Sequence, residues 1–130
     1  MLRAHILVIE DNPENLALMT YLLRSAGYRY RVAVDGQEGI DLAREELPDL
    51  VLCDIHMPVL SGYEVAKQFK QDARLRDVPI VAVTAYAMVG DREQILSSGF
   101  DMYIAKPIKP ETFIQDIETM LSPERVAQQL

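Results

Sequence analysis

Short apolar runs alternate with longer amphipathic segments along the chain. The apolar runs are predicted strands, at residues 5–9, 30–34, 50–53, 79–83 and 101–105. The amphipathic segments repeat apolar residues at helical spacing and are predicted helices, at residues 13–26, 36–46, 61–71, 85–98 and 110–121. This alternation predicts an α/β fold. The middle strands are apolar at nearly every position, which indicates a doubly wound parallel sheet with helices on both faces.

Residues that typically begin or end helices stand at the predicted boundaries. Asn12 precedes a proline and is a predicted N-cap, and Gly27 is expected to end the same helix. Asp35 and Ser61 are further predicted N-caps, each followed by a glutamate three residues later. Lys109 stands at the expected cap position of the last helix, so that helix is predicted to be poorly capped.

Composition and charge narrow the classes of function. The 130 residues fit one domain, and the net charge of −7 argues against electrostatic binding to nucleic acid or to an anionic membrane surface. There is no secretory segment and no apolar run near about 18 residues, so no membrane span is predicted. The single cysteine, Cys53, is predicted to be a small buried hydrophobe, and we expect a reducing, cytoplasmic location.

Polar groups stand where four of the predicted strands end. Glu10 and Asp11 follow the first strand, Asp54 the third, Thr84 the fourth and Lys106 the fifth. Ligands of an open parallel sheet bind outside the carboxyl ends of its strands. We therefore expect these side chains to converge on one pocket.

The chemistry of that pocket points to a divalent cation and a phosphoryl group. Two like charges about 4 Å apart repel by roughly 4 kcal/mol at an effective dielectric of about 20, so Glu10, Asp11 and Asp54 need compensation. Lys106 compensates one charge, and Mg²⁺, which prefers carboxylates, waters and phosphate oxygens, compensates more. The pocket lacks the histidine and cysteine ligands that zinc favours. Asp54 stands alone at its strand end and is the candidate nucleophile for an aspartyl-phosphate.

Four sequence motifs resemble those of response-regulator receiver domains. They are EDN at residues 10–12, DIHMPVLSG at 54–62, TA at 84–85 and KPI at 106–108, in the order and at the spacing of that family. The resemblance covers residues 4–121, and residues 79–92 are most similar to receivers of hybrid kinases and single-domain phosphorelay regulators. It implies a flavodoxin-like (βα)5 fold with strand order 2-1-3-4-5.

The resemblance also implies a role for each site residue. Asp54 would accept phosphate from a phosphohistidine donor. Asp11 and Asp54 would bind Mg²⁺ directly, Glu10 largely through water, and His56 through its backbone carbonyl. Lys106 would pair with the Asp54 carboxylate or phosphate, and its bond to the following proline would be cis.

Three further positions concern switching and phosphate lifetime. The resemblance implies that Thr84 reorients toward the phosphate and that the Tyr103 ring turns inward as Thr84 moves. His56 and Tyr86 stand two residues after Asp54 and Thr84, at positions that flank the path of attacking water in this family. We hypothesise that Tyr86 shields the acyl phosphate, and we expect the His56 side chain to face solvent.

Several of these residues also have purely structural interpretations. Thr84 alone would be an N-cap of the next helix. Tyr103 alone would be half-buried packing, and Lys106 alone a solvated surface lysine. His5, near an exposed strand terminus, is expected to be structural.

Taken together, the sequence predicts a receiver domain at residues 1–121 and a polar tail or linker at residues 122–130. It would act as a phosphorylation switch and not as a turnover enzyme. Its expected partners are a histidine kinase or histidine phosphotransfer protein upstream and a protein target at the surface of residues 85–121. The sequence leaves open the cognate kinase, the target, whether the chain is one module of a larger protein, homodimer formation and the lifetime of the phosphate.

Three rival functions make different predictions. A Mg²⁺-dependent phosphatase with an aspartate nucleophile would carry a second acid where His56 stands. A flavodoxin-like flavin carrier would need a phosphate loop after the first strand, where the chain is acidic. A degenerate receiver that docks partners without phosphorylation would not need Thr84, Lys106 and the acids together.

Overall fold

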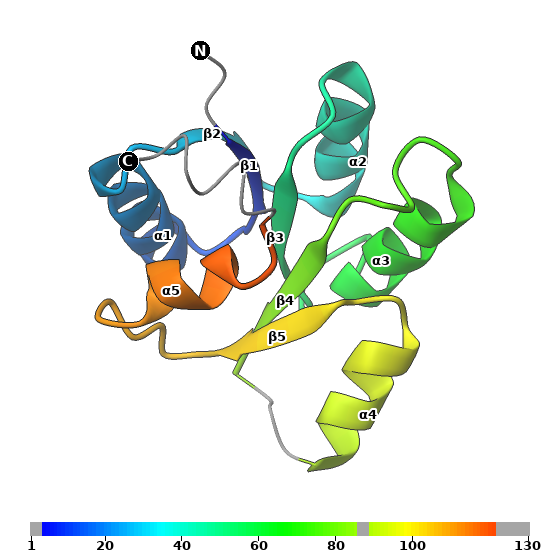
Figure 1. Ribbon diagram of the computed structural model, residues 1–130. Coiled ribbons are helices and arrows are strands. Elements are labelled where there is room, and N and C mark those ends of the chain that lie inside the picture. Colours follow the sequence, from blue (N-terminus) through cyan, green and yellow to red (C-terminus); the bar gives the residue numbers. More distant parts are fainter. Residues whose placement is uncertain (1–3, 86–88, 122–130) are drawn as a thin grey trace.

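The computed structural model describes residues 4–85 and 89–121. A five-stranded sheet lies at the centre, with strand order β2-β1-β3-β4-β5 and parallel pairing throughout (Figure 1). The predicted doubly wound fold and the order 2-1-3-4-5 are therefore confirmed. In chain order the elements are β1 (His5–Ile9), α1 (Pro13–Ser25), β2 (Arg29–Ala33), α2 (Gly36–Glu45), β3 (Leu50–Asp54), α3 (Gly62–Gln71), β4 (Ile80–Thr84), α4 (Val89–Ser97), β5 (Met102–Ala105) and α5 (Phe113–Glu118).

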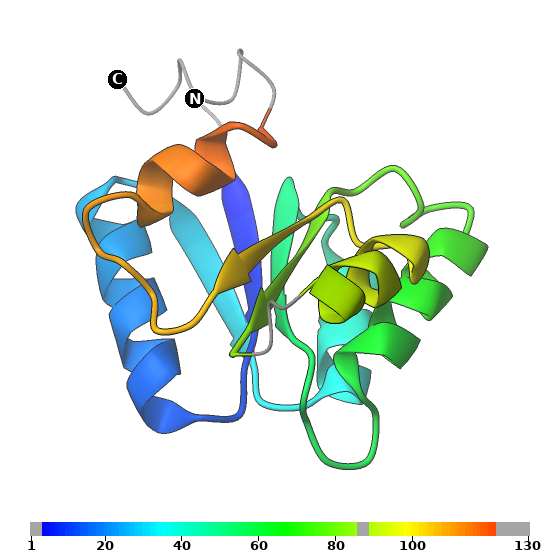
Figure 2. The same ribbon diagram turned by 90° about the horizontal axis from the view of Figure 1, so that it is seen from below.

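Helices cover both faces of the sheet. Figure 2 shows α1 and α5 on one side and α2, α3 and α4 on the other. Successive strand residues point to opposite faces, so β3 contributes Val51 and Cys53 to one core cluster and Leu50 and Leu52 to the other. Cys53 is fully buried, as its sequence position predicted.

The predicted N-caps of the first three helices are confirmed. The side chain of Asn12 accepts a hydrogen bond from the backbone N–H of Asn15 at 3.0 Å, and Asp35 accepts one from Glu38 at 2.8 Å. Ser61 accepts one from the N–H of Glu64 at 3.4 Å. Each bond satisfies an N–H group that the first turn of a helix leaves without an internal partner.

The ends of the last two helices differ from the prediction. The described part of α4 covers Val89–Ser97, and Ala85, the predicted first residue, is instead a bend after β4; residues 86–88 lie outside the described part. α5 spans only Phe113–Glu118. Before it, Thr112 and Phe113 both donate to the carbonyl of Lys109 in a turn, and its cap position has no side-chain hydrogen bond.

Two further expectations need correction, and a third lies outside the described residues. β2 covers residues 29–33 and not 30–34, because Val34 lies beyond the last paired residue. His5 is 3% exposed and starts β1, which lies between β2 and β3, so its strand end is not exposed. The predicted tail at residues 122–130 falls outside the described residues. None of the described helices is long and apolar enough to cross a membrane.

Candidate functional site

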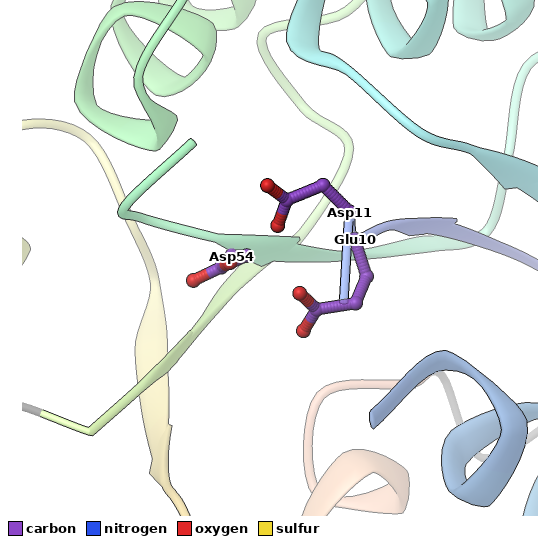
Figure 3. Close-up of side chains that lie close together, drawn as sticks. All are labelled: Glu10, Asp11 and Asp54. Carbon is purple, nitrogen blue, oxygen red and sulfur yellow. The ribbon is translucent and has the colours of Figure 1, made fainter. Parts of the chain in front are cut away.

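Three carboxylates meet at the carboxyl ends of β1 and β3 (Figure 3). The two strands are neighbours, with Ile9 level with Cys53, so Glu10 and Asp11 emerge beside Asp54. One carboxylate oxygen from each acid lies within 4.8 Å of the other two. Glu10 is fully buried and Asp54 is 6% exposed, whereas Asp11 faces solvent. The site is thus open on the Asp11 side and closed beneath Glu10.

Lys106 brings a positive charge to the two buried acids. It follows β5, and its backbone N–H donates to the Thr84 carbonyl at 2.7 Å, which fixes the start of the loop. Its Nζ lies 3.2 Å from Oε1 of Glu10 and 3.4 Å from Oδ1 of Asp54. The Lys106–Pro107 bond is cis, as the resemblance implied. The lysine side chain is 15% exposed, so solvent screens this charge only partly.

Glu10 has a strongly perturbed protonation equilibrium. Burial raises its pKa to about 7, and the neighbouring Asp54 carboxylate adds to the rise. The backbone N–H of Asn12 donates to Oε2 at 3.2 Å and, with Lys106, acts in the opposite direction. Near neutral pH Glu10 is therefore partly protonated, and a bound cation would compete with that proton.

The loop after Asp54 ends at Gly62, whose backbone lies close to the backbone of Asp54 and Ile55. Gly62 donates its N–H to the Ile55 carbonyl at 2.8 Å. A Cβ atom at position 62 would lie 2.4 Å from the carbonyl oxygen of Asp54, which no other residue could accept without a shift. In the same loop the N–H of His56 donates to Oδ1 of Asp54 at 3.3 Å, and the His56 residue is exposed.

Thr84 and Tyr103 lie on the neighbouring strands β4 and β5. Thr84 is the last residue of β4 and is 1% exposed. Ala85 after it is a bend, and the following residues 86–88, on which an N-cap role of Thr84 depends, lie outside the described residues. Tyr103 is half-buried and packs against the core cluster under α3 and α4. Tyr86, the predicted shield of the phosphate, lies outside the described residues.

Two residues of interest were not singled out from the sequence. Val59 has a φ angle of 69° and is fully exposed; nothing in its identity predicts this, since β-branched residues avoid positive φ. Arg92 lies over the Tyr103 ring, with 5.6 Å from Cζ to the ring centroid. A contact between α4 and β5 depends on tertiary packing, which sequence periodicity does not give.

Comparison with known proteins identifies the family of this site. The family model for the response regulator receiver domain matches residues 6–118. The polar-differentiation response regulator DivK of Brucella anthropi is 45% identical over 116 residues, which are 89% of this chain and 94% of DivK. DivK of Brucella ovis has the same identity and coverage.

Solved structures agree in fold. The receiver domain of a sensor histidine kinase from Pseudomonas aeruginosa PAO1 has a TM-score of 0.84 and 36% identity, over 92% of this chain and 98% of that one. Its structure has a magnesium ion coordinated in the active site cleft. The chemotaxis protein CheY4 of Vibrio cholerae has a TM-score of 0.87 and 25% identity, over 92% of this chain and all of that one.

Proposed function

Because this chain belongs to the response regulator receiver family of two-component signalling, we propose that it accepts a phosphoryl group on Asp54 from a phosphohistidine. One observation supports this assignment above all. Of the three acids, only Asp54 is itself the last residue of a central strand, and it is also nearly buried and contacts Lys106 directly. A carboxylate held in this way can attack phosphorus while the flanking cation stabilises the transferring group.

The phosphoryl transfer forms one bond and breaks one bond. An oxygen of Asp54 forms a new bond to phosphorus while the phosphorus–nitrogen bond of the phosphohistidine breaks. The imidazole nitrogen leaves with the electron pair of that bond and takes up a proton from water. Lys106 then neutralises part of the charge on the phosphoryl oxygens, and the Thr84 hydroxyl donates a hydrogen bond to one of them after it reorients.

The donor set fits Mg²⁺. The three carboxylates have oxygens within 4.8 Å of one another, and a single lysine contacts two of them, which leaves negative charge uncompensated. Asp11 and Asp54 would hold the ion directly, Glu10 through water, and His56 through its backbone carbonyl. When bound, Mg²⁺ would supply further positive charge to the phosphoryl oxygens.

The output of the reaction is a changed surface. Response regulators are in general not turnover enzymes, and we propose that this chain catalyses only its own phosphorylation and dephosphorylation. Its donor would be a histidine kinase or histidine phosphotransfer protein, and this chain would act in the cytoplasm. Movement of Thr84 and Tyr103 would alter the surface formed by α4, β5 and α5, to which a protein target would bind.

The phosphatase alternative has less support. Such phosphatases carry a second acid two residues after the nucleophile. In this chain that position is His56, which is exposed. A degenerate docking receiver also has less support, because the acids and Lys106 remain in contact.

Intact-mass spectrometry after incubation with acetyl phosphate tests the proposed function. We expect a single phosphate adduct that requires Mg²⁺ and is absent from Asp54→Ala. Asp101→Ala serves as a control, since this acid lies at the opposite end of the sheet. An adduct that survives Asp54→Ala, or no adduct on the folded wild type, would contradict the assignment.

A further inference from the structure

Arg92 of α4 contacts the aromatic face of Tyr103 on β5. The guanidinium carbon lies 5.6 Å from the ring centroid, within the range of an attractive cation–π interaction. Arg92 is exposed, whereas the ring of Tyr103 packs on the core cluster that includes Ile95 and Phe100. The tyrosine is therefore held between the core on one side and a cation on the other.

The geometry of the sheet connects this contact to Thr84. Tyr103 is level with Ala82 in the parallel pairing of β4 and β5. Side chains alternate along a strand, so Tyr103, Ala82 and Thr84 belong to the same face of the sheet. α4 covers that face as well (Figure 1). In the proposed function the ring turns toward Thr84, and such a turn would change its contact with the guanidinium of Arg92.

We propose that Arg92 is a positioning residue, which holds Tyr103 in the orientation seen here and so opposes the phosphorylated conformation. The proposal rests on the switch role of Tyr103 in the proposed function. Arg92 and phosphorylated Asp54 then act on the same ring in opposite directions. Removal of the guanidinium raises the resting population of the inward ring.

The expected size of the effect is modest. Cation–π contacts at exposed sites change an equilibrium by roughly two- to fivefold. When only a small fraction of molecules has the inward ring, the apparent affinity for a ligand that requires it rises by the same factor. Arg92 therefore biases the switch and does not block it.

Beryllofluoride with Mg²⁺ is a suitable probe, because it mimics the phosphoryl group on an aspartate and binds reversibly. Its apparent dissociation constant is measured by NMR on protein labelled with 3-fluorotyrosine, and the Tyr103 signal is assigned from Tyr103→Leu. We expect Arg92→Met to bind beryllofluoride roughly two- to fivefold more tightly than wild type and to shift the resting Tyr103 signal toward its bound position. Loss of a positive charge weakens binding of an anion, so a gain in affinity has the opposite sign to a simple charge effect.

Matched variants separate positioning from structural effects. Arg92→Lys keeps a cation and is expected to stay near wild type. Lys67→Met changes the net charge equally from the exposed face of α3 and is expected to change neither the affinity nor the Tyr103 signal. In the Tyr103→Leu background, Arg92→Met should have no further effect on affinity, because the interaction energy of the pair is already lost.

The outcomes separate a failure of the proposed phosphoacceptor function from a failure of the positioning role of Arg92. A wild type that takes no phosphate from acetyl phosphate overturns the proposed function and the switch together. Normal phosphorylation, combined with unchanged affinity and an unchanged Tyr103 signal in Arg92→Met, overturns the positioning role alone. An equal gain from Arg92→Met with and without the Tyr103 ring also overturns it.

Discussion

Glu10 combines complete burial with an ionisable group beside a second acid. Its pKa rises from 4.5 to about 7 on folding, chiefly because burial disfavours the charged form. The folded state therefore holds this proton more strongly than the unfolded chain. That preference is fully present below pH 4.5 and is lost as the pH rises through 7.

We predict that Glu10→Gln removes this pH dependence. Relative to the variant, wild type should lose on the order of 2–3 kcal/mol of unfolding free energy between pH 5 and pH 8 in the absence of Mg²⁺. Urea unfolding at several pH values measures the difference in unfolding free energy between the two proteins. Burial lowers the pKa of His5, which has the opposite effect on stability. His5 is present in both proteins, so its contribution cancels in the difference. Parallel curves for the two proteins would contradict the assigned cause.

Val59 is strained and gains nothing from packing. Its φ of 69° suits glycine, and its side chain is fully exposed. Val59→Gly is predicted to stabilise the fold by about 0.5–1 kcal/mol, since relief of strain exceeds the added entropy of the unfolded chain. A rise in the urea midpoint with an unchanged slope would show this. Val34 is also exposed but does not have a positive φ, so Val34→Gly should destabilise the fold instead.

At the level of elements, strands were easier to predict than the last two helices. Buried parallel strands carry continuous apolar runs, so the predicted strand boundaries were all correct to within one residue. α4 has Ile95 as its only fully buried side chain among those described, so periodicity could not fix its start. α5 ends early because Met120 and Leu121 donate to carbonyls three residues back and tighten the chain into turns.

The weak anchoring of α4 gives a prediction about its stability. A Cβ atom at Gly90 would meet none of the described residues within 4 Å. Gly90→Ala is therefore predicted to stabilise α4 by up to about 0.5 kcal/mol, somewhat less than in the middle of a helix because Gly90 lies in the first turn. Hydrogen exchange of the α4 amides should slow by about twofold, while exchange in α1 stays unchanged. Faster exchange of the α4 amides in Gly90→Ala would contradict the predicted stabilisation.

In the whole molecule, sheet topology decides which residues meet. Strand-end polar residues pointed to a common pocket, and the structure brings Glu10, Asp11, Asp54 and Lys106 together. The sequence did not separate the buried Glu10 from its exposed neighbour Asp11, because adjacent residues after a strand carry no signal of depth. The contact between Arg92 and Tyr103 likewise depends on how α4 sits on the sheet.

Cation binding should stabilise the whole domain. A ligand that binds only the folded state at about one hundred times its dissociation constant adds roughly 2.7 kcal/mol. We predict a Mg²⁺-dependent rise in thermal stability that Asp11→Asn largely removes, measured by calorimetry at constant ionic strength. Asp77→Asn, which changes an exposed acid in the loop before β4, should leave the response to Mg²⁺ intact. An equal response in Asp11→Asn would contradict the assigned ligands.

The identity of the phosphorylated residue tests the central claim most directly. Borohydride reduces an acyl phosphate to an alcohol and so converts a phosphorylated aspartate into homoserine, which tandem mass spectrometry locates in the sequence. After reaction with acetyl phosphate and Mg²⁺, we predict homoserine at position 54 alone, and none without Mg²⁺. Homoserine at position 11, or at no position in a protein that has gained phosphate, would contradict the account.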